Sequence, residues 1–516
     1  MTPAGAILHA ACRHYGSRVA ARIGDSQLTY SALGERSARF ANALMGLGIG
    51  PGAPFAAFLD DRVENIEIYL GAALAGAVLV PVNMRFKSGE VAHILADSRA
   101  RGMVVAAPLA EVAAGVPGIN DIGPLIMVGD GERPRGALLY EDLLSRASSS
   151  APDAARGPED IAVVGYTSGT TGAPKGAQAS HRALVNCTRL QAMVQGMAAY
   201  GSASFGGSFS FVSALWGVLY PLLYTGSMLR VINPMDLERW FASMEEDACT
   251  YTWVPSPLVR DFAARLPKHP KLLASLQTIV HTGSKVPRDY TATLVEVAGQ
   301  RFLETWGMTE SVGPVCATTR PDLAGVCTAR DVLTTVGRPV PGAEVRVLDA
   351  EGRPAGAGAS GELAVRASTL FSGYLNRPEA DRQSFVDGWF LTGDVGEQDE
   401  QGYVYITDRS KDVIVSGGMN VYPSEVELVL ARLAGLREAC VLGVPDARWG
   451  ETVAVAAVRA PGARIEAGDV VAHVRDNLAT YKKPTHVLFV DALPRNASMK
   501  VQKPQLRPLF GDHSKV

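Results

Sequence analysis

The 516-residue chain has little cysteine, and its six cysteines form neither a Cys-x-x-Cys pair nor a group with histidines. This spacing argues against a zinc site and favours single buried thiols in a reducing compartment. The chain also lacks a long apolar run, since glycines interrupt the longest one, residues 72–82. Such a stretch is too short to span a bilayer, and the first residues lack the basic start of a signal peptide. We therefore expect a cytoplasmic protein with no membrane span.

An excess of charge of one sign is missing as well. The 49 Lys and Arg residues nearly balance the 52 Asp and Glu residues, which gives a net charge of −3. A surface of this kind has no general attraction for nucleic acid or anionic lipid, so we expect no nucleic-acid partner. The hydrophobic content of 47% and charged content of 20% are typical of a globular protein.

Helical and strand patterns alternate over the first part of the chain. Apolar residues recur at helical spacing from Tyr30 to Gly48, and residues 53–59 then form a short buried-strand run. Residues 72–82 pass from a helical pattern into a strand pattern, and residues 161–166 form another buried run. This alternation predicts a layered α/β architecture with a mainly parallel sheet.

From about residue 340 the pattern changes to strand hairpins. Residues 345–348 and 362–366 flank a turn rich in Gly, Pro and Ala, and residues 403–407 alternate like a half-exposed strand. The polar segment 408–412 follows directly and is the candidate domain boundary. The remaining residues, 409–516, are enough for a separate small α+β domain.

The densest polar motif is a glycine-rich loop that follows the buried run 161–166. Glycines let backbone N–H groups approach an anion, hydroxyls donate hydrogen bonds, and a lysine adds positive charge. Its spacing differs from that of Walker A, and an ordinary polar surface loop is the alternative. Because Ser180 is a suitable N-cap for a helix to about Met197, we expect a strand–loop–helix unit that binds phosphate. The loop consists of Thr167, Ser168, Gly169, Thr170, Thr171, Gly172, Ala173, Pro174, Lys175 and Gly176.

Three further motifs follow the loop, at residues 306–310, 388–394 and 494–500. Together with the loop they resemble the superfamily of acyl- and aryl-CoA synthetases, peptide-synthetase adenylation domains and firefly luciferase. The resemblance extends from Leu28 to Lys500. It implies an N-terminal adenylation domain over residues 1–408, built from layered α/β subdomains plus a β-barrel-like part. It also implies a small mobile α+β domain over residues 409–516, with a hinge near 408–411.

The resemblance also implies a nucleotide site. The Trp306 ring is expected to lie against adenine, where many relatives carry Tyr. Asp394 and Arg409 are expected to bind the ribose, because a carboxylate can accept from two hydroxyls. Glu310 and Thr170 are the candidate Mg²⁺ ligands, since hard oxygen atoms suit this ion. The other candidate nucleotide contacts outside the loop are Gly283, Ser284, Gly307 and Thr309.

The resemblance implies different roles for Lys500 and Lys411. Lys500 is expected to bridge the substrate carboxylate and the α-phosphate as charge builds there, although relatives often carry Gly where this chain has Met499. Lys411 aligns with the hinge position, where a polar residue suits a change of backbone angles. The candidate CoA contacts are Gly417, Gly418, Trp449 and Lys482.

The region expected to bind the acid departs from the family pattern. Phe211 stands where relatives often carry His, and Trp216 and Tyr220 follow at helical spacing. These aromatic residues favour an apolar or aromatic carboxylate, although ordinary core packing explains all three equally well. The remaining candidate substrate contacts are His281, Gly307 and Met308.

The implied activity is an ATP-dependent ligation in two steps. A carboxylate attacks the α-phosphorus of Mg·ATP to give an acyl-adenylate and pyrophosphate, and CoA then displaces AMP. A carrier-protein thiol, an amine or another nucleophile is the alternative acceptor. A catalytically inactive nucleotide-binding protein is a further alternative, against which the intact residues Thr170, Glu310, Asp394, Arg409 and Lys500 argue. The identity of the acid stays open, as does the choice between monomer and homodimer.

Overall fold

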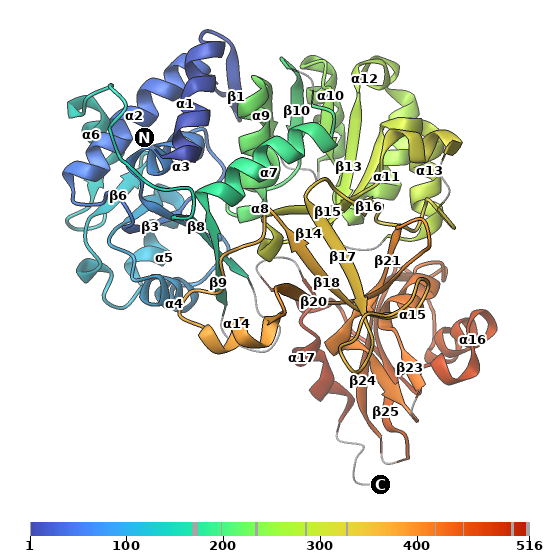
Figure 1. Ribbon diagram of the computed structural model, residues 1–516. Helices are drawn as coiled ribbons and strands as arrows, with labels where there is room; N and C mark the ends of the chain where they lie inside the picture. Colours follow the sequence, from blue (N-terminus) through green and yellow to red (C-terminus); the bar gives the residue numbers. More distant parts are fainter. Residues whose placement is uncertain are drawn as a thin grey trace.

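The computed structural model describes residues 2–167, 174–197, 199–232, 236–283, 286–326, 329–417, 419–446, 448–496 and 500–511. Within these ranges the chain forms two large sheets, a smaller curled sheet and a C-terminal α+β domain (Figure 1). This confirms the α/β fold class that the sequence predicts.

Sheet B is built from the first third of the chain. Its strands are parallel except for the antiparallel pair β8–β9. Side chains alternate between its two faces: Phe55 and Ala57 enter the central core, whereas Ala56 and Phe58 enter a second core on the other side. In spatial order its strands are β7 (Leu138–Leu139), β6 (Leu125–Val128), β5 (Met103–Ala106), β3 (Pro54–Phe58), β4 (Val78–Val82), β8 (Ile161–Thr167) and β9 (Lys175–Ser180).

Sheet A is the larger sheet, with nine strands. Its middle strands are parallel, and antiparallel strands close both edges. In spatial order they are β16 (Arg338–Pro339), β15 (Gly313–Ala317), β14 (Phe302–Met308), β13 (Thr278–Thr282), β12 (Tyr251–Trp253), β10 (Ser202–Phe205), β11 (Met228–Val231), β1 (Val19–Ile23) and β2 (Ser26–Thr29).

Helices fill the space between the two sheets and cover their outer faces. The central core joins both sheets to helices α1, α2, α3, α7 and α9, while α4 and α5 cover sheet B and α10 to α13 cover sheet A. The helices of this large domain are α1 (Pro3–Tyr15), α2 (Tyr30–Gly46), α3 (Glu64–Ala75), α4 (Ser88–Ser98), α5 (Ala110–Ala114), α6 (Tyr140–Arg146), α7 (His181–Val194), α8 (Val212–Ala214), α9 (Tyr220–Thr225), α10 (Leu237–Glu246), α11 (Val259–Arg265), α12 (Pro270–Ser275), α13 (Arg288–Ala298) and α14 (Pro378–Ser384).

The two remaining sheets follow one another along the chain. Sheet C is antiparallel and holds the predicted hairpin of residues 345–348 and 362–366. Its strands are β17 (Ala343–Leu348), β18 (Gly361–Ala367), β20 (Trp389–Gln398), β19 (Phe385–Val386) and β21 (Val404–Arg409). Sheet D and its helices form the C-terminal domain: β23 (Met419–Val421), β22 (Ile414–Ser416), β25 (Gly450–Arg459), β24 (Leu436–Asp446), β26 (His486–Phe489), α15 (Pro423–Leu430), α16 (Ala467–Asn477) and α17 (Lys503–Leu506).

The segment predicted as the domain boundary lies between sheets C and D. Strand β21 ends at Arg409, the short helix η9 (Ser410–Asp412) follows, and β22 begins at Ile414. The C-terminal domain contacts the large domain through an ion pair of 3.3 Å between Arg432 and Asp289. Rotation about Lys411 stays a prediction.

One local expectation is wrong. The sequence predicts a strand–loop–helix unit with Ser180 as the N-cap, but a further strand, β9, lies between the loop and α7. Lys175–Ser180 pairs with β8, and its alanines Ala177 and Ala179 are buried in the core. The loop therefore joins two antiparallel strands instead of preceding a helix N-terminus. Ser180 does cap α7 as predicted, because its hydroxyl accepts from the N–H of Ala183.

Two findings concern the membrane and the cysteines. No helix there is long and apolar enough to cross a membrane. The five cysteines that the structure describes are all buried and free, while Cys327 lies outside the described residues.

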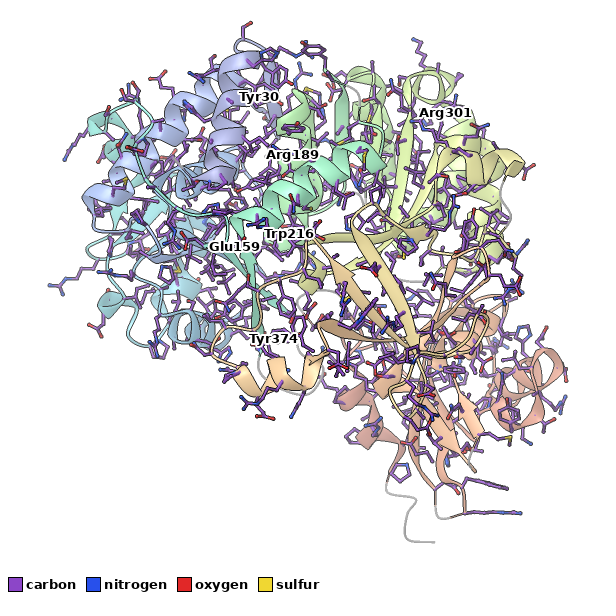
Figure 2. The ribbon with its side chains drawn as sticks, in the orientation of Figure 1. Tyr30, Glu159, Arg189, Trp216, Arg301 and Tyr374 are labelled. Carbon is purple, nitrogen blue, oxygen red and sulfur yellow. The ribbon has the colours of Figure 1, made fainter. Side chains whose placement is uncertain are left out.

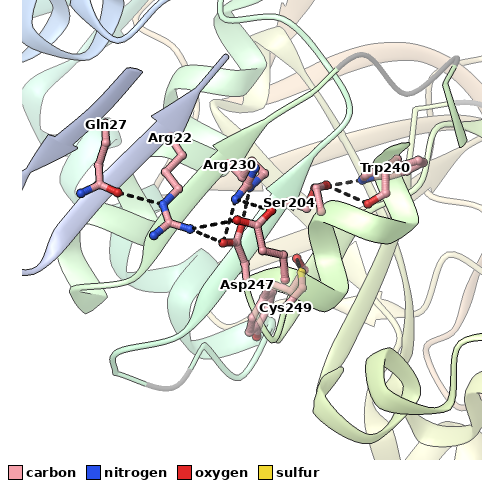
Figure 3. Close-up of polar contacts among 10 residues, drawn as sticks. Arg22, Gln27, Ser204, Arg230, Trp240, Asp247 and Cys249 are labelled. Atoms are coloured by element: carbon pink, nitrogen blue, oxygen red, sulfur yellow. Dashed lines mark hydrogen bonds and ion pairs between the residues drawn. The ribbon is translucent and has the colours of Figure 1, made fainter. Parts of the chain in front are cut away.

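A buried carboxylate joins the N-terminal hairpin of strands β1 and β2 to the neighbouring strand β11 (Figure 3). Only 3% of the Asp247 side chain is exposed, and it accepts hydrogen bonds from two guanidinium groups. Arg22 of β1 donates at 2.6 Å and Arg230 of β11 at 2.9 Å. Gln27 of β2 in turn accepts from Arg22 at 3.0 Å. Strands β1, β2 and β11 are thus joined to the end of α10 by one ionised group.

The change Asp247→Asn is expected to lower the free energy of unfolding by about 3 kcal/mol, because it leaves two partly buried guanidiniums without their shared anion. Glu246→Gln is the control, since Glu246 also contacts both arginines but its side chain is 64% exposed. An exposed pair contributes about 0–1 kcal/mol. Thermal unfolding measured by circular dichroism should give a clearly lower midpoint for D247N than for E246Q. Equal midpoints would contradict this account of the network.

Candidate active site

Three sequence-predicted residues meet where sheet A contacts sheet C. The indole Nε1 of Trp306, on β14, donates to Asp394 Oδ2 at 3.0 Å. Arg409 lies opposite Asp394 in the β20–β21 ladder, and its Nε is 2.7 Å from Asp394 Oδ1. The side chain of Asp394 is 6% exposed. A buried carboxylate therefore receives one donor from each of two sheets.

The backbone before Asp394 is fixed by its own hydrogen bonds. Thr392 Oγ1 donates to the carbonyl of Leu363 at 2.7 Å and accepts from the N–H of Asp394 at 3.0 Å. Gly393 has a φ of 69°, a left-handed angle that glycine adopts without strain. The Gly–Asp pair of the sequence motif is thus explained by a turn that aims the carboxylate at Trp306 and Arg409.

Several charges determine the protonation of this carboxylate. Burial raises the pKa of Asp394, whereas Arg409, the Trp306 indole and Lys500 each lower it. Glu310 is close enough to raise it slightly. The charges of Arg409, Lys500 and Glu310 are therefore all close enough to Asp394 to influence its protonation.

Lys500 reaches this neighbourhood from the C-terminal domain. Its side chain keeps contact with solvent, yet the protein atoms around its ammonium lower the pKa of Lys500, and repulsion from Arg409 lowers it further. Glu310 and Asp394 act in the opposite direction. Lys500 is held by a backbone hydrogen bond to Asn496 Oδ1 at 2.9 Å. The two domains therefore sit in an arrangement that brings Lys500 to the predicted nucleotide site.

Glu310 is oriented by a residue that the sequence analysis missed. Tyr374, just before α14 (Figure 2), donates its hydroxyl to Glu310 Oε1 at 2.8 Å. Burial and the neighbouring carboxylate raise the pKa of Tyr374, so the phenol keeps the proton that it donates. The ammonium of Lys175 lies 5.2 Å from the centre of the same ring. Tyr374 thus joins the base of the glycine-rich loop to the candidate metal ligand, and no sequence motif marked it.

The residues present fit the implied Mg²⁺. In the described ranges no group of three or more His, Cys, Asp or Glu side chains could hold a metal ion. Mg²⁺ in nucleotide sites commonly uses one or two carboxylates together with substrate phosphates and water, so a single carboxylate is compatible with it. Glu310 would be that ligand, with its orientation set by Tyr374. The other candidate, Thr170, lies outside the described residues.

The remaining residues of the Trp306 motif have structural constraints of their own. A Cβ on Gly307 would lie 2.3 Å from the carbonyl oxygen of Gly313, so only glycine fits there. The N–H of Met308 donates to Ser311 Oγ at 2.9 Å. Thr309 lies against β8, since a Cβ on Gly165 would contact its methyl group at 3.3 Å. The motif is thereby placed beside the strand that leads into the glycine-rich loop.

His281, on β13, is buried in a polar chain with Ser256, which follows β12, and Glu304, which lies on β14. Its Nε2 is 2.8 Å from Ser256 Oγ, and its Nδ1 is 2.8 Å from Glu304 Oε2. Gly283 follows with a φ of 107° and open space around it. A direct substrate contact by His281 stays a prediction.

The candidate aromatic residues of the acid pocket fall into two groups, core residues and one partly buried residue. Trp216 and Tyr220 are each 2% exposed and belong to the central core, where Trp216 lies below α7 (Figure 2). The core interpretation therefore applies to both. Phe211 is only partly buried, directly before α8, and stays a candidate pocket residue.

Two of the candidate CoA contacts touch each other. The N–H of Gly417 donates to the carbonyl of Trp449 at 2.9 Å, and a Cβ on Gly417 would lie 2.7 Å from the indole ring. Trp449 is 44% exposed, and the guanidinium of Arg448 lies 4.6 Å from the centre of its ring. Lys482 instead forms an ion pair of 2.6 Å with Glu425.

The remaining site candidates are Thr167, Lys411 and seven residues outside the described ranges. Thr167 ends β8, and its hydroxyl donates to the carbonyl of Lys175 at 3.5 Å. Lys411 lies in η9, where removal from water lowers its pKa and Asp412 opposes that effect. The predicted site residues outside the described ranges are Ser168, Gly169, Thr170, Thr171, Gly172, Ser284 and Gly418.

Comparisons with known proteins agree with this arrangement. The family model described as AMP-binding enzyme matches residues 8–375, and the AMP-binding enzyme C-terminal domain matches residues 425–500. The chain belongs to the AMP-binding enzyme family. It is an adenylating enzyme of the AMP-forming acid–CoA ligase group within that family. The family resemblance stated from the sequence is thereby confirmed.

Individual members of the AMP-binding enzyme family match over almost their whole length. A feruloyl-CoA synthase from Amycolatopsis is 34% identical over 95% of this chain and 96% of its own. The long-chain-fatty-acid–CoA ligase FadD13 of Mycobacterium tuberculosis is 32% identical over 94% of each chain. The crystal structure of ATP-bound MatB from Rhodopseudomonas palustris is 28% identical, covers all of both chains and superposes with a TM-score of 0.87.

The contact between Tyr374 and Glu310 can be tested through the metal requirement. Tyr374→Phe removes the donor that orients the carboxylate, and loss of such a supporting group typically costs about tenfold or more in metal affinity. We expect the Mg²⁺ concentration for half-maximal pyrophosphate release to rise about tenfold.

Tyr403→Phe is the matched control for this experiment. Tyr403 also donates to a carboxylate, Asp322 Oδ1 at 2.6 Å, but that carboxylate is not a metal candidate. An unchanged Mg²⁺ requirement in Y374F, or an equal rise in Y403F, would contradict the role given to Tyr374.

Proposed function

We propose that the protein is an ATP-dependent acid–CoA ligase that activates an apolar aliphatic or aromatic carboxylic acid. In the first step the acid carboxylate attacks the α-phosphorus of ATP and forms an acyl-adenylate, with release of pyrophosphate. In the second step the CoA thiolate attacks the acyl carbon and displaces AMP.

The observation that carries the first step is the convergence of Lys500, Arg409, Glu310 and Asp394. Lys500 and Arg409 supply positive charge near the carboxylates, and their mutual repulsion lowers the pKa of Lys500. A polyanion such as a triphosphate would neutralise both cations, and charge that develops on the α-phosphate would meet a fixed ammonium. Glu310 would hold Mg²⁺ at the phosphates, and the ion would supply charge neutralisation there.

The choice of acid rests on the pocket candidates and on the relatives. Phe211 stands where a histidine is frequent in the family, and it offers an apolar surface with no charge. The matched relatives are named for feruloyl and long-chain acyl substrates, both of which have large apolar parts. CoA as the acceptor is supported by the same names and by the exposed side chain of Trp449 beside Gly417.

Pyrophosphate release measured across aliphatic, aromatic and amino acids, with and without CoA, tests this proposal. We expect release with apolar acids and formation of a thioester when CoA is present. Release without thioester formation would favour another acceptor, such as a carrier-protein thiol or an amine. Absence of release with every acid would contradict the proposed activity.

The role of Lys500 can be tested on each half-reaction separately. Lys500→Ala should lower adenylate formation by at least 100-fold, because one fixed charge at a developing oxyanion contributes roughly 10²–10³ in rate. Thioester formation from supplied acyl-adenylate should remain within about twofold of wild type. Lys271→Ala, at an exposed position on α12, is the control and should change neither step. Equal loss of both half-reactions in K500A would overturn the assignment.

A further inference from the structure

Trp306 does more in this structure than present an aromatic ring. The indole N–H is the only polar group of the side chain, and it donates to Asp394 Oδ2 at 3.0 Å. Trp306 is 8% exposed, so this N–H has been taken out of water to make the bond. The other carboxylate oxygen, Oδ1, is held by Arg409. Both oxygens of Asp394 are therefore oriented before any nucleotide arrives.

This arrangement leaves acceptor capacity on each oxygen. A carboxylate has about four lone-pair sites, and the two donors among the described residues use two of them. One site on each oxygen is left for the two hydroxyls of a ribose. We propose that Trp306 is a positioning residue that fixes Asp394 for the two ribose hydroxyls, and so determines how strongly the enzyme prefers ribonucleotides. The inference rests on the proposed use of ATP.

The indole is the ring that can perform this task. Phenylalanine has no donor, and the hydroxyl of tyrosine extends from the far end of its ring, so neither places a donor at the position of Nε1. A buried carboxylate that loses one of two donors is less stable as an anion and less restricted in orientation. Both effects weaken acceptance of the ribose hydroxyls, whereas the contacts to phosphate do not depend on Asp394.

The experiment compares two nucleotides on the full-length protein. ATP and 2′,3′-dideoxyATP differ only in the two ribose hydroxyls, and equilibrium binding of each is measured by calorimetry. For Trp306→Phe we expect the ratio of the ATP affinity to the dideoxyATP affinity to fall about tenfold, the size expected for a charge-assisted hydrogen bond. Changed ring stacking or packing alters both affinities alike and leaves the ratio unchanged.

Trp240→Phe is the matched control. Trp240 is fully buried, and its Nε1 donates to Ser204 Oγ at 2.9 Å (Figure 3), so the same change removes an indole hydrogen bond away from the site. W240F should keep the wild-type ratio. An unchanged ratio in W306F, in a protein that binds ATP, would overturn this inference alone. A wild-type protein that binds neither nucleotide would overturn the proposed function as well.

A pH profile gives a second readout that loss of packing does not produce. The charged groups that act on Asp394 are Arg409, Lys500, Glu310 and Glu362. The Trp306 N–H stabilises the ionised carboxylate, so its removal raises the pKa of Asp394. Because the ionised form accepts the ribose hydroxyls, ATP binding by W306F should be lost at a higher pH on acidification than in wild type or W240F. If W306F, W240F and wild type all lose ATP binding at the same pH on acidification, the positioning role of Trp306 is contradicted.

Discussion

The site depends on one buried negative charge. Asp394 lies almost out of water, and an isolated carboxylate in such surroundings is costly unless charged or polar partners surround it. Its partners come from three parts of the fold: Trp306 from sheet A, Arg409 from sheet C and Lys500 from the C-terminal domain. The same carboxylate thus receives a hydrogen bond from the large sheet and an ion pair from the curled sheet, and it interacts electrostatically with the small domain.

Glu310, the second acidic residue of the site, is also held by an aromatic donor. Glu310 receives the Tyr374 hydroxyl, and the Tyr374 ring lies under the ammonium of Lys175 at the base of the glycine-rich loop. Each acidic group that would meet the nucleotide or its metal is therefore oriented by an aromatic residue with one polar donor. An aromatic donor restricts the direction of a carboxylate without neutralising its charge, as an ammonium would.

Cations gather on the side of the C-terminal domain. Arg409, Lys411, Lys500 and Lys503 influence one another, and removal from water together with neighbouring positive charge lowers the pKa of both Lys411 and Lys500. Asp412 and Glu427 offset part of this charge next to Lys503. A site with this distribution is complementary to a polyanion placed between the two domains.

The secondary-structure elements predicted correctly are those with a strong repeat of apolar residues. Helix α2 and strands β3, β4 and β8 bury continuous or regularly spaced apolar residues, so their patterns predicted them. Strand β9 reads Lys-Gly-Ala-Gln-Ala-Ser, which carries little strand propensity, and only its pairing with β8 makes it a strand. From the sequence, Trp216 and Tyr220 could have been either pocket or core residues. Helical spacing shows which residues share a face, but it does not show what that face contacts.

The sequence by itself determined the family, because the loop, Trp306, Asp394 and Lys500 belong to motifs whose order and spacing are chemical signatures. It also determined the layered α/β class, since strand and helix periods are local properties of the chain. Only the tertiary structure decided how those residues act on one another. Trp306 and Asp394 are 88 residues apart, and Tyr374 and Glu310 are 64 apart. Hydrogen bonds across such separations depend on how sheets A and C pack, and no local pattern records that packing.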